Sequence, residues 1–462
     1  MIPDFLTIAE AAKLIEKKEV SPVELTQSRL QRIEKLNGQL HAFIRVLPDE
    51  AHAAARTAES EIMAGRYKGP LHGIPIGLKD IYETAGIPTT GHSKVMQDHV
   101  PKADAFTVTK LKGAGGVVMG KLATHEFALG GPSFDLPWPP ARNPWDTTRF
   151  TGGSSSGTGA AVPAGLVLGG TGSDTGGSIR GPGAYCGIAG IKPTYGLCSR
   201  AGILPLAFSL DHAGPMAWTA EDCAIMLQAM AGHDPADPAS AKVAIPDFRK
   251  ALTGDVKGLR IGLIRHFYTT DNEANAATHD AIDAAAKQYE AMGASVREIT
   301  VSPLAEWAAP GIMIMMAEAY AIHEANLRTR FTDFGEAFRD RMALAGLWTA
   351  SDYVQATRRR REMVDELDRA MASLDLVMTA AAPTEAPQID EVPKFAIMER
   401  PSLTMPFNVT GSPAMSVCCG FTEAGLPLSF QIVGKRFDDA TVLRAADAYE
   451  RATPWRGRRP SL

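Results

Sequence analysis

Apolar and polar positions follow a helical period at the start of the chain. Thr7 and Glu10 have the spacing of a capping box, in which two side chains satisfy free backbone N–H groups at a helix start. The run Ser21-Pro22-Val23-Glu24 repeats this spacing and places proline at the first helical position. Gly38 is a suitable helix stop. The pattern predicts two helices, which form a helical preface over residues 1–60.

The pattern changes near residue 70, where short apolar runs bounded by glycine alternate with helices. Residues 259–264 form one such run, a helix ending at Gly293 follows, and residues 296–299 form a second run. This order predicts a βαβ unit and therefore a sheet that is at least partly parallel. Further strands are predicted at residues 116–119, 166–168, 375–379, 415–418 and 430–433. The fold class is α/β.

Composition and charge narrow the range of partners. Hydrophobic residues make up 45% of the 462 residues and charged residues 21%, as in an ordinary globular protein. The net charge of -5 gives no electrostatic reason to expect nucleic acid. No apolar run approaches the ~20 residues that span a bilayer, and the N-terminus does not resemble a signal peptide. We expect a soluble cytoplasmic protein with neither a nucleic acid nor a membrane as partner.

Cysteine and histidine patterns give no sign of a metal site. The five cysteines are odd in number and include no C-x-x-C pair, so we expect reduced thiols rather than disulfides or zinc. The H-E-x-x-H motif is absent as well. The sequence predicts neither a metal nor a cofactor.

Glycine and serine are concentrated between residues 150 and 215, most densely at 152–157 and 172–180. Dense glycine permits unusual backbone conformations, and successive N–H groups in such turns can bind an anion. A flexible linker is a weaker explanation, because apolar runs and fixed Asp, Arg and Pro interrupt the stretch. Phosphate-loop signatures are absent. Residues 153–157 match G-x-S-x-G, a motif that also needs a strand-turn-helix context and a histidine partner.

A serine nucleophile needs a base. None of the eleven histidines lies in a motif that ties it to these serines, and we expect structural roles for the nearest two, His125 and His212. S-x-x-K is absent. Lys79 ends an apolar run punctuated by glycine and proline, at residues 71–80. By itself, a lysine at the end of a strand is usually a solvated charge or part of an ion pair, so the role of Lys79 has to be inferred from the motifs around it.

Taken together, these motifs resemble those of the amidase signature family. The matching segments cover nearly the whole chain: residues 73–80, 152–155, 172–180, 190–194, 411–414 and 425–434. The resemblance implies one α/β domain over residues 1–462. Its single large mixed sheet of about eleven strands would be covered by helices on both faces. Residues 70–215 would be the catalytic signature core, and residues 257–462 the C-terminal half of the same sheet with substrate-pocket segments.

The resemblance also implies residue roles. The residue matching Ser178 is the nucleophile, the one matching Ser154 sits on a cis peptide and relays the proton, and the one matching Lys79 is the base. The oxyanion hole is expected from the backbone N–H groups of Thr175, Gly176, Gly177 and Ser178. Supporting roles are expected for Ser155, Asp174 and Arg180, the last two as a buried network, because their motif leaves little room for solvated side chains.

Lysine chemistry agrees with these roles. A free lysine has a pKa of about 10.4, too high for a base at neutral pH. Burial disfavours the ammonium and lowers the pKa. A drop to about 7 corresponds to about 4.6 kcal/mol, which the fold must supply by desolvating Lys79.

Two further hypotheses stay open beside a stand-alone amidase of aryl or alkyl amides or carbamates. One is the glutaminase (A) subunit of a tRNA-dependent amidotransferase; the other is a catalytically dead partner subunit. Residues 122–127 depart from the glutaminase's Thr-Asn-Met-Asp-Glu-Phe, and residues 325–360 lack two of its signatures, which favours the stand-alone amidase. The expected partner is a small-molecule amide, and a homodimer is compatible with the sequence. The candidate substrate pocket comprises Phe127, Phe134, Trp138, Tyr195 and Met315.

Overall fold

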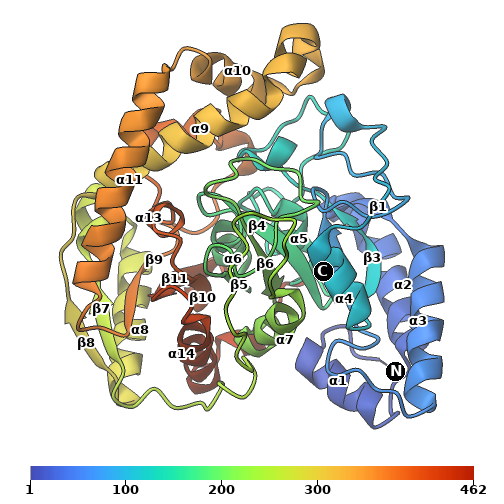
Figure 1. Ribbon diagram of the computed structural model, residues 1–462. Coiled ribbons are helices and arrows are strands. Elements are labelled where there is room, and N and C mark those ends of the chain that lie inside the picture. The colour runs from blue at the N-terminus through green and yellow to red at the C-terminus, as the bar shows by residue number, and fades with distance from the viewer. Residues whose placement is uncertain (1) are drawn as a thin grey trace.

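An eleven-stranded mixed sheet runs through the computed structural model, which describes residues 2–462 (Figure 1). The strands are β1 (Phe43–Val46), β2 (Pro75–Lys79), β3 (Val117–Leu122), β4 (Gly169–Asp174), β5 (Ala189–Lys192), β6 (His212–Ala217), β7 (Arg260–Leu263), β8 (Ser295–Glu298), β9 (Leu376–Ala380), β10 (Ala414–Phe421) and β11 (Pro427–Gly434). Their order is β1-β3-β2-β4-β6-β5-β10-β11-β9-β7-β8. Strands from both halves of the chain therefore join one sheet, as predicted.

Helices cover both faces of this sheet. The helices are α1 (Ile8–Glu16), α2 (Pro22–Leu40), α3 (Pro48–Met63), α4 (Phe106–Gly113), α5 (Ser156–Ala161), α6 (Arg180–Cys186), α7 (Ala220–Met230), α8 (Ala276–Ala291), α9 (Leu304–Thr329), α10 (Glu336–Ala345), α11 (Ala350–Ala370), α12 (Ala396–Glu399), α13 (Pro406–Val409) and α14 (Asp439–Ala452). Helices α5 and α6 pack on one face, and α7, α8 and α14 pack on the other. The predicted α/β class with a helix-covered mixed sheet is confirmed.

The N-terminal helices begin where their capping residues predict. Both Thr7 and Ser21 accept hydrogen bonds from the backbone of the first helical turn in complete capping boxes. The second helix does not stop at Gly38 but continues to Leu40, which is fully buried. Burying a leucine contributes about 1.5–3 kcal/mol, more than the ~1 kcal/mol that an internal glycine costs. The predicted preface is also not wholly helical, because β1 pairs with β3 at the sheet edge.

Strand β4 begins directly after the predicted apolar run at residues 166–168. It is rich in glycine because helices press on it from both sides. A Cβ at Gly169 would lie 2.5 Å from the sulfur of Met226 in α7, and one at Gly170 would lie 2.8 Å from the Thr158 methyl in α5. Only glycine allows both approaches, so the sequence of this central strand lacks the usual apolar signal.

The predicted βαβ unit is confirmed as β7, α8 and β8, with the two strands parallel. Helices α9 and α10 lie at the top of Figure 1, and α11, which packs against α9, runs from there down the left side. Helix α13 also packs against α9. None of the helices among residues 2–462 is both long and apolar enough to cross a membrane.

Candidate active site

Three serine hydroxyls surround the amine of Lys79. This lysine ends β2, and its backbone N–H donates to Thr171 Oγ1 on the neighbouring parallel strand β4 at 2.9 Å. Its Nζ lies 2.7 Å from Ser154 Oγ, 3.0 Å from Ser155 Oγ and 2.8 Å from Ser173 Oγ. The lysine is fully buried. The parallel pairing of β2 with β4 thus brings the lysine to the glycine-serine region.

Burial lowers the pKa of Lys79 to about 7, while the carboxylates of Asp174 and Asp211 act in the opposite direction. A substantial fraction of the amine is therefore neutral at neutral pH. This value equals the one that the base role was expected to require.

Hydrogen-bond directions indicate where the amine's lone pair points. A neutral amine has two N–H donors and one lone pair. The Ser155 hydroxyl donates to the carbonyl oxygen of Ser173 at 3.3 Å, so it accepts one N–H from Lys79. The second N–H and the lone pair are then divided between Ser154 and Ser173, and the relay role implied for Ser154 requires that the lone pair face Ser154. This arrangement lets Ser154 donate its proton to the lysine.

Two adjoining loops carry the candidate relay serine and the candidate nucleophile. The Gly153–Ser154 peptide bond is cis, as the family resemblance implied. Ser154 is fully buried, whereas Ser178 is 9% exposed and lines a cavity. The backbone N–H of Ser155 donates to the Ser178 carbonyl at 3.2 Å and holds the two loops together. Ser154 is therefore placed inside the protein and Ser178 at its accessible edge.

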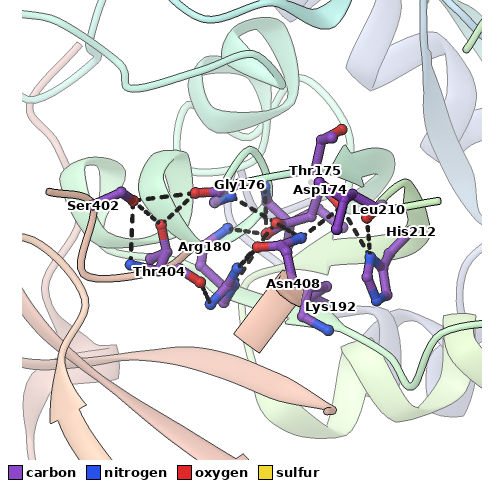
Figure 2. Close-up of polar contacts among 12 residues, drawn as sticks. Asp174, Thr175, Gly176, Arg180, Lys192, Leu210, His212, Ser402, Thr404 and Asn408 are labelled. Atoms are coloured by element: carbon purple, nitrogen blue, oxygen red, sulfur yellow. Dashed lines mark hydrogen bonds and ion pairs between the residues drawn. The ribbon is translucent and has the colours of Figure 1, made fainter. Parts of the chain in front are cut away.

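The loop that carries Ser178 is fixed by a buried ion pair. Arg180 Nη2 lies 3.0 Å from Asp174 Oδ1, and both side chains are fully buried (Figure 2). Arg180 also donates to the Thr404 carbonyl and Gln431 Oε1, each at 2.8 Å, and to Asn408 Oδ1 at 2.6 Å. Burial alone would raise the pKa of Asp174, but the Arg180 guanidinium holds it below its usual range. The expected buried network is present.

Asp174 also orders the backbone of the expected oxyanion hole. Its Oδ1 accepts the N–H of Gly177 at 2.7 Å, so this N–H is engaged inside the loop. The φ of Gly177 is 132°, and a Cβ there would lie 2.1 Å from Thr404 Oγ1. Among the described residues, the N–H groups of Thr175, Gly176 and Ser178 have no hydrogen-bond acceptor. Because Asp174 already accepts the Gly177 N–H, a contact from Gly177 to the substrate oxygen stays a prediction.

Arg180→Met is expected to lower the free energy of unfolding by about 3–5 kcal/mol, because it leaves Asp174 buried without its cation. Urea denaturation measures this change. Arg436→Met is the matched control, since Arg436 forms an ion pair with Asp368 at the surface and its loss should cost less than about 1 kcal/mol. Similar losses in the two variants would contradict the structural role of the buried pair.

A cavity of about 320 Å³ opens above Ser178. Its polar lining includes His125, Arg341 and Arg400, and its apolar lining includes Met315. Of the five residues predicted for the pocket, only Met315 lines this cavity. Phe127 is buried among other rings, Phe134 is 58% exposed, and Trp138 and Tyr195 also lie outside the cavity. Aromatic character alone did not distinguish core, surface and pocket.

His125 lies closer to the candidate catalytic serines than its expected structural role implied. Its Nδ1 accepts the N–H of Gly131 at 2.7 Å, so Nε2 carries the hydrogen. The ring packs on Gly153, where a Cβ would lie 1.9 Å from Cε1 of the histidine. Burial and the nearby Lys79 hold the pKa of His125 well below its usual range, so the ring is neutral. It acts as a wall of the cavity and shapes the loop that carries Ser154.

Sequence reasoning also missed Ser173 and Arg341 as site residues. Ser173 lies within the glycine-rich segment 172–180, so its position near the candidate catalytic serines could have been inferred from the sequence. Arg341 lies in α10, far along the chain from every serine motif, and no local pattern distinguishes it. Across residues 2–462, no three His, Cys, Asp or Glu side chains form a group suited to a metal ion.

Comparison with known proteins places this geometry in a family. The family model described as Amidase matches residues 24–443. The chain belongs to the amidase signature family. It is accordingly a hydrolase that acts on carbon–nitrogen bonds.

Members of several branches of the amidase signature family are similar over full length. The chain is 39% identical to the A subunit of glutamyl-tRNA(Gln) amidotransferase from Chloroflexus aggregans, over 99% of this chain and 98% of the relative. Peptide amidase from Stenotrophomonas maltophilia has a TM-score of 0.87 at 30% identity, covering 98% of each chain. A chain from the structure "An unexpected vestigial protein complex reveals the evolutionary origins of an s-triazine catabolic enzyme" has a TM-score of 0.91 at 32% identity, covering 96% of this chain and 98% of that one.

Proposed function

We propose that this protein hydrolyses small amides that carry a carboxylate, through an acyl-enzyme on Ser178. The observation that carries the substrate class is Arg341, a buried guanidinium in the same cavity as Ser178. The catalytic roles rest on the hydrogen bonds around Lys79 and on the family resemblance.

Arg341 has no acidic partner among the described residues. It is 1% exposed, and its Nε donates to the Lys394 carbonyl at 2.7 Å. Its other nitrogens donate to the carbonyl oxygens of Gly130 and Lys394. Burying a charge without a counter-ion is costly, and a guanidinium matches a carboxylate in geometry. A carboxylate on the substrate would provide the missing charge, and the exposed Arg400 at the same cavity adds to the attraction.

Acylation then proceeds through the serine pair. Lys79 takes the proton of Ser154, which takes that of Ser178, and the Ser178 oxygen attacks the amide carbon. The N–H groups of Gly176 and Ser178 stabilise the oxyanion, a type of contact that typically contributes about 3–4 kcal/mol. The intermediate collapses as the C–N bond breaks, and the proton returns through Ser154 to the leaving nitrogen. Water then attacks the ester by the same route and releases the carboxylic acid.

The second candidate is the glutaminase component of a tRNA-dependent amidotransferase. Full-length identity of 39% to such a protein supports it. Glutamine carries a carboxylate that Arg341 could bind, but it also carries an α-ammonium. Among the described residues that line the cavity there is no Asp or Glu to receive that ammonium. The cavity therefore favours a carboxylate-bearing amide without an ammonium.

A substrate panel with the purified chain alone tests both candidates. Succinamic acid should be hydrolysed faster than its neutral analogue butyramide, and faster than glutamine. The glutaminase would be favoured if the protein hydrolysed glutamine but neither of the other two amides, and did so only when a second protein chain was present. A fluorophosphonate that fails to label the chain would instead favour a catalytically dead partner subunit. The cytoplasmic location stays a prediction. The homodimer stays one as well, because one relative is named as a subunit and another as part of a protein complex, and either could pair with a different chain.

Arg341→Met should lower kcat/KM for succinamic acid by about ten- to a hundredfold, since one bidentate charge contact is removed. Butyramide is the control substrate and should lose less than about threefold. The loss should lie mainly in KM, which a general disturbance of the catalytic serines would not produce. An equal loss on both substrates would contradict the carboxylate role.

A further inference from the structure

A second cavity, of about 260 Å³, includes in its lining Ser173, whose hydroxyl contacts Lys79. Its lining includes Ser173, Asp211 and His212. Leu206 and Ala128 line both this cavity and the one above Ser178, so they form part of the wall between them. Nothing in the acylation and deacylation steps uses this space.

Ser173 connects this cavity to the base. Its hydroxyl oxygen accepts from Lys79 Nζ at 2.8 Å, and the residue also faces the cavity. The Ser155 hydroxyl donates to the Ser173 carbonyl, whereas no acceptor among the described residues takes the Ser173 hydroxyl hydrogen. That hydrogen is free to point into the second cavity.

The cavity is polar enough to hold water. His212 Nδ1 lies 2.6 Å from the Leu210 carbonyl and 3.1 Å from the Asp174 carbonyl, so it carries the hydrogen (Figure 2). The His212 Nε2 is then an acceptor, and it is buried with no partner among the described residues. The Asp211 carboxyl lines the same space. A space of this size with several polar partners accommodates several water molecules, each taking about 30 Å³.

The proton balance of the proposed reaction leaves a proton on Lys79 that water in this cavity could accept. Deacylation releases a carboxylic acid, whose ordinary pKa of about 4 lies well below that of the buried lysine. The acid O–H bond breaks, its proton moves through the serines, and an N–H bond forms on Lys79. The lysine must lose this proton before it can act as a base again. The product carboxylate still occupies the first cavity at that moment.

We propose that the second cavity is a proton exit from Lys79, with Ser173 as the connecting hydroxyl. The Lys79 N–H bond breaks as a bond forms to Ser173 Oγ, and the Ser173 O–H passes its own hydrogen to cavity water. Asp174 and Asp211 raise the pKa of the lysine, and His125 lies on the substrate side. The second cavity is lined by His212 and by the Arg200–Asp237 ion pair as well. The Asp174 and Asp211 carboxylates favour the transient ammonium and neither accepts its proton directly. This inference rests on Lys79 being the base of the proposed reaction, and does not depend on the substrate class.

Ser173→Ala tests the exit, assayed on whichever amide the wild-type protein hydrolyses. We expect kcat to fall on the order of tenfold and to rise again with added imidazole, a small proton carrier that can enter the open cavity. Wild-type kcat should not depend on imidazole. Ser173→Thr keeps the hydroxyl and should keep most of kcat without added imidazole, which also shows that the strand tolerates change at this position.

A loss of kcat in Ser173→Ala that imidazole does not restore would overturn the proton exit in favour of a purely structural role. An unchanged kcat would overturn it as well. These outcomes are separate from a failure of the proposed function, in which the wild-type protein itself would hydrolyse no amide. Ala236→Trp, at the exposed rim of the second cavity, should abolish the imidazole rescue in a double variant with Ser173→Ala, whereas Ala53→Trp on the exposed surface of α3 should not.

Discussion

Ser178→Ala is expected to abolish the acyl-enzyme and to lower kcat on the order of 10⁶-fold, as the loss of a serine nucleophile does elsewhere. Ser178 is the candidate catalytic serine that lines the first cavity, whereas Ser154 is fully buried. The Ser178 hydroxyl is small and lies at the cavity edge, so the variant should keep the fold. Mass spectrometry after reaction with a fluorophosphonate or a slow amide measures the adduct directly, and circular dichroism checks the fold.

Ser402→Ala is the matched control for the nucleophile. Ser402 lines the same cavity, and its hydroxyl lies 3.3 Å from the carbonyl oxygen of Gly176. This variant should still form the adduct on Ser178. An adduct on Ser154 or Ser155 in the wild-type protein would contradict the assignment.

Lys79→Ala is expected to lower amide hydrolysis at neutral pH by about 10⁴-fold, the upper range for general acid–base catalysis. The lysine must be neutral to accept a proton, so wild-type activity should fall as the pH drops through an apparent pKa of about 7. Above that pH the amine is deprotonated and the activity should level off. This apparent value belongs to the coupled site of lysine and serines. Arginine should not replace the lysine, because a guanidinium stays charged.

An ester with the same acyl group is the control for Lys79. Its leaving alcohol needs less help from a proton donor than an amine does, so Lys79→Ala should impair ester hydrolysis less. The pH–rate profiles of wild type and variant on both substrates give the comparison. A mutant that keeps the acidic limb unchanged, or that loses the same factor on both substrates, would point to another base.

Much of the fold follows from local sequence. The capping boxes at Thr7 and Ser21 fix two helix starts because both partners lie within one turn. The βαβ unit follows from two apolar runs around an amphipathic helix. The local sequence did not predict strand β4, because its glycines make room for helices packed on both faces of the sheet. The residues that contact these glycines, Thr158 and Met226, lie in other segments of the chain.

The sequence by itself determined the candidate catalytic set of Lys79, Ser154 and Ser178, because short glycine-rich motifs bracket each of them and the motifs together resemble one family. Only the tertiary structure decided what surrounds that set. Ser173 became a partner of Lys79 through the parallel pairing of β2 with β4, and Arg341 reached the cavity from α10. The Phe134 side chain went to the surface instead. The positions of these side chains depend on the order of strands in the sheet and on the packing of helices that are distant in the chain. The hydrophobic pattern within one segment does not contain this information.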